Sequence, residues 1–447
     1  LNKLAYDEYN ADAFGDIIES LTKSFVQTQS VKPFLTNSWN QNFIPRFLKI
    51  VLERSGDNPV VLELAGQLFG YVVRFIEKSK HQALFEEYAS ILLDNRSIQG
   101  VSTSSVSEMP SARITLLKHL LAKIDKSVEF PGEAQKKLIQ KFASFVQRSE
   151  TGLIRLGYLQ SIALLVNKFT PANDEFVSKL FVETFEAGST DSASFEIAVW
   201  VLKGLIVKLD PAGSKFLDLA VTQLTESNNL PYCKAISSSF IILMSDLDIF
   251  TNKENSKTRI ISGVMNLNAR LLYKQQIFES LLQKLLNNFT ASQEAARREI
   301  NLTTLAVIIN NVSSDILKPH LKEVLPLVLN GLTIHNSSVL EASLQTFKVI
   351  IQESPSLIQE NLSSLLSKLL FLVTSKVVVN KQLVNNEKIR LLSLDCILGI
   401  FTTLEHTKLV RYQNNARVEL ARALDDKKRT VRKKATDVRQ VLYELGH

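Results

Sequence analysis

The sequence is poor in the residues that build disulfide scaffolds and metal centres. It has two cysteines in 447 residues, Cys233 and Cys396, and neither lies in a Cys-x-x-Cys pair or a Cys/His cluster. The six histidines are scattered singly along the chain. These spacings exclude a disulfide framework and a four-thiolate metal or iron-sulfur site, and they favour exposed or internally satisfied histidines over metal ligands. We therefore expect no metal and no other cofactor.

Glycine and proline are scarce as well, at 15 and 11 residues, whereas 45% of the chain is hydrophobic. That is too few turn-forming residues for a large sheet protein, so the composition favours an all-helical one. No apolar run reaches the roughly 18 residues of a membrane span, and no charged-then-apolar leader opens the chain, so we expect a soluble protein. Because residue 1 is a leucine inside a helical pattern, we also expect a fragment of a longer protein.

The clearest helical pattern lies between residues 420 and 445. Asp425 and Asp426 stand at its centre and supply acceptors for the first backbone amides of the helix that follows. That helix carries apolar residues on one narrow face, namely Val431, Ala435, Val438, Leu442 and Leu445. An acidic corner followed by Val-Arg-x-x-Ala resembles a HEAT repeat, a helix hairpin that buries its faces only by stacking on neighbours.

The same feature returns along the chain at the interval typical of HEAT units. A small or apolar residue, followed in most cases by a base, marks the start of each inner helix. Of the seven separations between these markers, four lie within a residue of 42. The markers are Arg113, Arg155, Ile197, Lys234, Arg297, Leu340, Arg390 and Arg432. The sequence therefore predicts an all-α solenoid of about nine to ten antiparallel helix pairs that form one curved array.

The predicted solenoid has an N-terminal part and a long repeat region. We expect residues 1–55 to form helices that continue a longer solenoid, and residues 56–447 to form the HEAT-repeat C-terminal region. Polar stretches near 95–108, 250–268 and 375–388 predict loop insertions between repeats. The first of these is interpreted as a flexible insertion, with a phosphorylation site as the alternative.

No arrangement in the sequence is typical of an enzyme. There is no Gly-rich phosphate loop, no G-x-S-x-G and no H-E-x-x-H motif. Paired carboxylates occur at Glu86–Glu87, which a solvated helix face explains, and at Asp425–Asp426, which a helix cap explains. We therefore expect a protein that acts by binding and not by catalysis.

Positive charge gathers at the C-terminal end. From Arg411 to His447 there are ten lysines and arginines against five acidic residues, so +5 of the net charge of +7 lies there. The candidate partner-binding side chains in this part are Lys427, Lys428, Arg429, Lys433 and Arg439. Since no aromatic residues interleave with the first three and no long basic stripe continues them, an acidic patch on a protein fits better than nucleic acid.

Structural roles are the alternative for part of this basic cluster. Lys433 can pair with Asp437 one turn on, and Arg432 can bond to the acidic corner of the preceding repeat. The run Lys427–Arg429 lies in the turn before the last helix, where we expect no internal partner for it.

A second candidate binding segment follows the 250–268 insertion. Arg270, Tyr273, Lys274 and Gln275 bring residue types that are common at interfaces to the start of a helix. Ordinary packing of that helix is an equally good explanation.

Several segments together resemble the C-terminal half of the MMS-nineteen family, the large HEAT-repeat subunit of the cytosolic iron-sulfur protein assembly (CIA) targeting complex. They are spread over about residues 154–445 in family order, whereas residues 1–150 are supported only by continuity. The matching segments are Leu165–Lys168, Trp200–Lys203, Phe240–Asp246, Arg270–Phe278, Leu424–Arg429 and Val431–Lys433.

The resemblance implies a non-catalytic adaptor in the cytoplasm and nucleus. Family members are similar to a platform whose C-terminal repeats dock a small cluster-carrier protein and a WD40-propeller subunit. The assembly then recruits apo iron-sulfur clients such as helicases, primase and polymerases, which links the family to DNA repair and transcription. Two alternatives stay open, an importin-like HEAT transport receptor and a nucleic-acid-associated scaffold. The net positive charge disfavours the first, because cargo-binding faces of such receptors are commonly acidic.

Overall fold

The computed structural model describes residues 44–54, 59–93, 111–149, 152–244, 267, 270–292, 294–379 and 382–444. Three predictions therefore lie outside the described residues. They are the helices before residue 44, the insertion at 95–108, and all but residue 267 of the insertion at 250–268.

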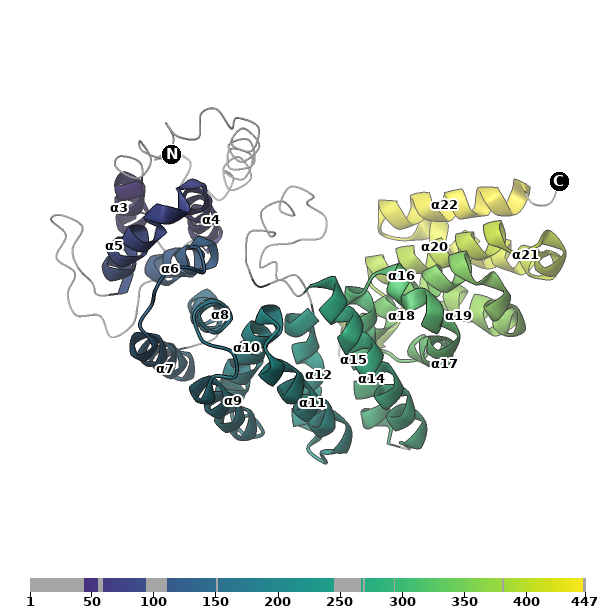
Figure 1. The fold of residues 1–447 in the computed structure, drawn as a ribbon. Helices are drawn as coiled ribbons and strands as arrows, with labels where there is room; N and C mark the ends of the chain where they lie inside the picture. The colour runs from purple at the N-terminus through teal and green to yellow at the C-terminus, as the bar shows by residue number, and fades with distance from the viewer. Residues whose placement is uncertain are drawn as a thin grey trace. The chain divides into compact units, whose positions relative to one another are not determined.

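The described residues fold almost entirely into helices, which confirms the all-α prediction (Figure 1). They form two compact units, and the described residues of the first lie within the bounds Leu1–Ala220 and Ile242–Arg270. Its helices are α3 (Ile44–Arg54), α4 (Pro59–Phe75), η4 (Lys78–Lys80), α5 (His81–Leu93), α6 (Ser111–Lys123), α7 (Gly132–Arg148), α8 (Leu153–Lys168), α9 (Glu175–Ala187) and α10 (Ser192–Lys208). The two units share α11 (Pro211–Glu226) and α12 (Leu230–Met244).

The second unit comprises Val221–Ile241 and Leu271–His447. Its elements are α14 (Leu271–Ala291), α15 (Ala295–Asn311), α16 (Ser314–Leu317), η5 (Lys318–His320), α17 (Leu321–Gly331), α18 (Ser337–Glu353), η6 (Pro355–Asn361), α19 (Leu362–Thr374), β1 (Val378–Val379), β2 (Gln382–Leu383), α20 (Glu387–Thr403), α21 (His406–Ala421), η7 (Arg422–Asp425) and α22 (Arg429–Glu444). No helix in the described ranges is both long and apolar enough to cross a membrane.

The predicted repeat phase is confirmed. Every marker residue falls within the first six residues of a helix, in α6, α8, α10, α12, α15, α18, α20 and α22. Within each unit these inner helices pack on one another in sequence order, α4 on α6, α6 on α8 and α8 on α10, then α15 on α18, α18 on α20 and α20 on α22. The chain is thus an α-solenoid of HEAT type in which each outer helix precedes its inner partner.

A short hairpin adds the one pair of strands found among the described residues. β1 and β2 pair antiparallel, with Val378 opposite Leu383. They lie between α19 and α20, inside the stretch 375–388 where the sequence predicted only a loop. The β-branched run Val377–Val379 explains the difference, because such residues favour extended backbone.

Inner and outer helices differ in how much of their surface they bury. The inner helix α10 is buried on all sides, with Trp200 at 2% exposure and Lys203 at 0%. The outer helix α9 buries one stripe, represented by Val177, Phe181 and Phe185. This contrast follows from stacking, because neighbours cover an inner helix on both flanks and an outer helix on one face.

Lysines satisfy the carbonyl ends of inner helices across the repeats. Lys168 of α8 donates to the carbonyls of Leu121, Ala122 and Ile124 at 2.6–2.8 Å, at the end of α6. Lys203 of α10 donates to Leu243 O at 3.0 Å, near the end of α12. These carbonyls have no partner within their own helix, and a cation at that end also complements the helix dipole.

Gly204 offers a test of the close packing between α8 and α10. A Cβ at this position would lie 2.6 Å from the carbonyl oxygen of Ala163, which is backbone and cannot rotate away. We expect Gly204→Ala to lower the free energy of unfolding by about 1–3 kcal/mol, because α8 and α10 must separate. Urea unfolding followed by circular dichroism measures the change.

Gly132→Ala is the matched control for that variant. Apart from its chain neighbours and the nearby backbone of its own helix, nothing lies within 4 Å of a Cβ at Gly132, so the added methyl should be neutral or slightly stabilising in α7. Equal unfolding midpoints for the two variants would contradict the close packing of α8 and α10.

Candidate protein-binding site at the C-terminal repeats

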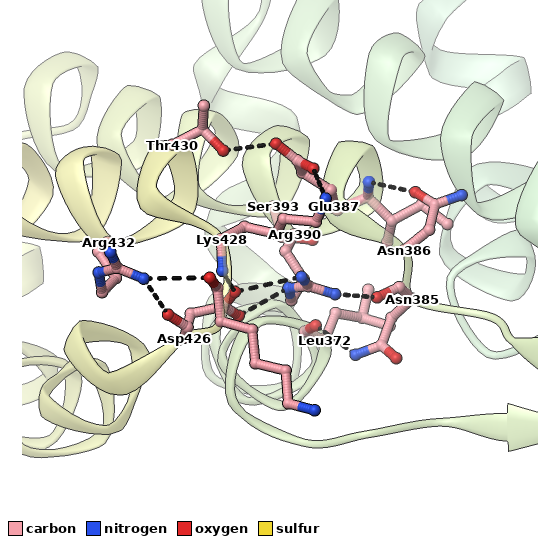
Figure 2. A network of polar contacts seen from close by, with 12 residues as sticks. Leu372, Asn385, Asn386, Glu387, Arg390, Ser393, Asp426, Lys428, Thr430 and Arg432 are labelled. Carbon is pink, nitrogen blue, oxygen red and sulfur yellow. Dashed lines mark hydrogen bonds and ion pairs between the residues drawn. The ribbon is translucent and has the colours of Figure 1, made fainter.

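The corner before α22 is organised by Asp426. Its carboxylate accepts the backbone N–H of Lys428 at 2.8 Å and forms an ion pair with Arg390, with Nε 2.9 Å from Oδ2 (Figure 2). One side chain thus fixes the turn in front of α22 and joins it to α20. The sequence predicted a helix cap at Asp425–Asp426, but the amide that Asp426 accepts belongs to Lys428, which precedes the first residue of α22.

Arg390 is held from the other side by the start of its own helix. It is 9% exposed, and its Nη1 donates to Asn385 O at 2.7 Å. Asn385 in turn donates to Leu372 O at 2.8 Å, near the end of α19, and Asn386 caps α20 by accepting Ile389 N–H at 3.1 Å. Arg390 and Asn385 together therefore link α19, α20 and α22 through nearly buried polar contacts.

Arg432 lies one turn past the corner and bonds back to it. Its Nη1 donates to Asp426 O at 2.6 Å and to Lys427 O at 3.2 Å. The predicted contact with the acidic corner of the preceding repeat is therefore wrong, because the carbonyls of its own corner are within reach. The contact between repeats is made instead by Arg390, which bonds to the corner of the following repeat.

Lys428 also has an internal partner, contrary to the prediction. Its Nζ lies 3.3 Å from Glu387 Oε2 on α20, and the Thr430 hydroxyl donates to Glu387 Oε1 at 2.5 Å. The hydrogen bond from Thr430, followed by that from Lys428, holds the pKa of Glu387 below its usual value. Lys427 and Arg429 are exposed, and neither has an ion pair among the described residues.

Lys433 and Lys434 point to different environments although they are adjacent. Lys433 is exposed and, in the described part of the chain, has no ion pair with Asp437. Lys434 lies 2.5 Å from Asp395 Oδ1, and Lys348 lies 3.0 Å from Oδ2 of the same carboxylate. Burial would raise the pKa of Asp395, but the hydrogen bonds from the two lysines outweigh it and lower that pKa. These contacts join α18, α20 and α22.

Arg439 belongs to a second polar surface, on α21 and α22. Its Nη2 donates to the Tyr443 hydroxyl at 3.3 Å, and Arg417 lies over the same ring at 4.5 Å. Tyr443 is 50% exposed, and Val418 beside Arg417 in the sequence is 68% exposed. Arginine and tyrosine are enriched at protein interfaces. Arg417 and Tyr443 were not among the predicted site residues, because residues on two different helices share no sequence period.

The second predicted segment spans the start of α14. Arg270 lies just before this helix, and Tyr273, Lys274 and Gln275 lie within it. Tyr273 and Lys274 are 6% and 9% exposed, so burial removes them from the surface. Arg270 is exposed, and Gln275 donates to Glu279 at 2.9 Å. The exposed apolar side chains here are Leu271 at 59% and Leu272 at 66%. This segment packs with α15 and is separate from the corner at α20 and α22.

Both cysteines are buried in the described residues. Cys233 Sγ lies 3.5 Å from Ser227 O, and Cys396 Sγ lies 3.4 Å from Leu344 O. Burial raises the pKa of both thiols, so they stay protonated near neutral pH. No group of three or more metal-ligating side chains is found in the described ranges.

Comparison with known proteins relates the chain to one family. A family model described as "RNAPII transcription regulator C-terminal", MMS19_C, matches residues 1–401. The chain belongs to the MMS19 family. Its relatives include the DNA repair/transcription protein MMS19 of Saccharomyces cerevisiae, 26% identical over 90% of this chain and 36% of that protein. The "MMS19 nucleotide excision repair protein homolog" of Xenopus laevis is 25% identical over 80% of this chain and 33% of that protein.

The chain spans about a third of the length of these MMS19 relatives. The "DNA repair/transcription protein mms19" of Schizosaccharomyces pombe aligns with 95% of this chain and 42% of its own length, at 24% identity. Among solved structures, yeast importin-beta aligns with 99% of this chain and 56% of its own, with a TM-score of 0.44 and 13% identity. That likeness is too distant to bear on function.

Arg390→Gln tests the link between α20 and α22. Glutamine cannot replace the ion pair with Asp426 or reach Asn385 O, so nearly buried acceptors lose their donor. We expect a loss of about 1–3 kcal/mol in the free energy of unfolding, measured by urea titration. Arg411→Gln, at an exposed position on α21, should cost less than about 0.5 kcal/mol. A similar loss in both variants would contradict the role of Arg390.

The ion pairs of Asp395 predict that the free energy of unfolding depends on pH. Because the pKa of Asp395 is lower in the folded chain than in the unfolded chain, its ion pairs stabilise above about pH 4. That contribution is lost as the pH falls through the folded-state pKa. The difference in unfolding free energy between the parent chain and Asp395→Asn should be about 1 kcal/mol from pH 5 to 7 and shrink below about pH 4. A difference that grows on acidification would refute this.

Proposed function

We propose that this chain is a non-catalytic adaptor of the cytosolic iron-sulfur targeting complex, present in the cytoplasm and nucleus. It docks a small cluster-carrier protein and a WD40-propeller subunit, and it recruits apo iron-sulfur clients such as helicases, primase and polymerases. The observation that carries the proposal is the family match over residues 1–401. The relatives' names refer to DNA repair and transcription, and we extend that role to this chain.

The chemistry of the chain supports an adaptor that acts through partners. A cluster-holding protein needs several thiolates at one place, whereas the two cysteines here are far apart in the sequence, buried and protonated. The solenoid supplies what docking needs, because its outer helices and corners present side chains that the core does not use.

We assign the carrier-docking contact to the exposed cations of the α22 corner, Lys427, Arg429 and Lys433. Lys428, Lys434 and Arg390 pair with carboxylates of α20 or its neighbours, so they hold the corner in place. Rim cations of this kind favour a partner that presents carboxylates, and they affect the rate of association most strongly.

Charge reversal at Lys427 and Lys433 tests this assignment. The purified chain and the small carrier protein should co-elute in size-exclusion chromatography. Lys427→Glu and Lys433→Glu should each weaken the complex about 3- to 10-fold at low salt, because each replaces attraction by repulsion. Isothermal titration calorimetry measures the affinity, and the thermal midpoint should not change, since neither side chain supports the fold.

Lys215→Glu is the control, because Lys215 is an exposed lysine on α11 in a part of the chain that we do not assign to docking. It should leave the affinity unchanged. Failure of the parent chain to bind the carrier would overturn the adaptor proposal. If Lys215→Glu weakens binding as much as the corner variants do, the carrier does not dock specifically at the α22 corner. If the chain still binds DNA at about 200 mM salt, the nucleic-acid alternative is favoured.

A further inference from the structure

Thr430 is an exposed hydroxyl in the middle of the basic corner. It is the second residue of α22 and follows Lys427, Lys428 and Arg429 directly in the sequence. Its one described side-chain contact is the hydrogen bond to Glu387 at 2.5 Å (Figure 2). A threonine preceded by three cations has the charge pattern read by protein kinases whose substrate cleft carries carboxylates.

Thr430 lies in the first turn of α22, where a short opening of the helix start exposes it to a kinase. Lys427 and Lys428 lie in the non-helical corner, and the first backbone bond of α22 runs from Arg432 N to Lys428 O at 3.2 Å. Residues 427–430 therefore donate no backbone amide to an intrahelical bond. Drawing them out opens the first turn of α22 and releases the contacts of Lys428 and Arg432 at the corner. It exposes none of the buried residues of α22, the first of which is Val431.

Thr436 has nearly the same sequence surroundings but a different structural position. It follows Lys433, Lys434 and Ala435, so cations stand two and three residues before it, as they do before Thr430. Yet it lies inside α22, and its hydroxyl donates to Arg432 O at 3.0 Å. A kinase would have to unwind the middle of α22 and expose Val431, Ala435 and Val438 to reach it.

We propose that Thr430 is a phosphorylation site for a basophilic protein kinase, and that its phosphate weakens the docking of acidic partners at the α22 corner. The predicted effect of the phosphate on docking rests on the proposed function. In the transfer, the Thr430 oxygen bonds to the γ-phosphorus of ATP, the bond to the β-phosphate oxygen breaks, and ADP leaves. The kinase's catalytic aspartate accepts the hydroxyl proton.

The phosphate would change the corner through charge. It adds about −1.5 to −2 beside Lys427, Lys428 and Arg429, and so cancels much of the local positive field. It also replaces the donor that now bonds to Glu387 with an anion that repels Glu387, while Lys428 gains a stronger partner than Glu387. A negative group in the first turn suits the dipole of α22, so the helix should remain folded.

Site mapping tests the modification. The folded chain is incubated with MgATP and the catalytic subunit of a cAMP-dependent protein kinase, and phosphate is mapped by mass spectrometry. We expect phosphate on Thr430 and not on Thr436, whereas an unfolded synthetic peptide of residues 425–440 should be modified on both. Thr430→Val, which keeps the β-branched shape at an exposed position, should abolish the signal.

The outcomes separate the modification from the proposed function. Phosphate that is absent from Thr430 of the folded chain, or shared equally with Thr436, overturns the inference. If the unmodified chain binds the carrier, phosphorylation should weaken binding about tenfold, and an unchanged affinity would overturn the regulatory half. If the unmodified chain does not bind, the adaptor function fails together with that half, while the mapped site on Thr430 stands.

Discussion

Within each unit, an inner helix such as α8 or α20 is covered by the inner helix before it and the one after it, because a single helix hairpin would leave an apolar face in water. α8, for example, packs on both α6 and α10, and consecutive residues from Ile162 to Val166 are all fully buried. At about 25 cal/mol per Å2 of apolar surface, each such contact contributes several kcal/mol before conformational entropy is subtracted. Stability therefore resides between repeats more than within them.

Stacking also brings helix ends into the interior, where their polar groups need partners. Lys168 and Lys203 supply donors to the carbonyl ends of neighbouring helices, and Asp426 supplies an acceptor to the turn in front of α22. Because each of these side chains reaches across repeats, or is held by one that does, it fixes the position of one inner helix on the next. Arg390 fills that role between α20 and α22.

The same corner separates structural cations from available ones. Lys428 and Lys434 are paired with carboxylates of α20, whereas Lys427 and Lys433 extend from the surface. A rigid corner that presents unpaired charge binds a partner without ordering its own backbone first, which lowers the entropic cost of association. Thr430 lies among these cations, so a single modification there acts on the whole group.

The sequence by itself determined the class of fold and the phase of its repeats, because helical period and corner chemistry are local and every marker from Arg113 to Arg432 falls at a helix start. It also located the basic cluster, since charge is read directly from residue type. Only the tertiary structure decided which cations are free, that Arg432 bonds to its own corner, and that Tyr273 is buried. It alone distinguished Thr430 from Thr436. Those properties depend on distances between residues on different helices, or on where a helix begins, and no sequence interval specifies them.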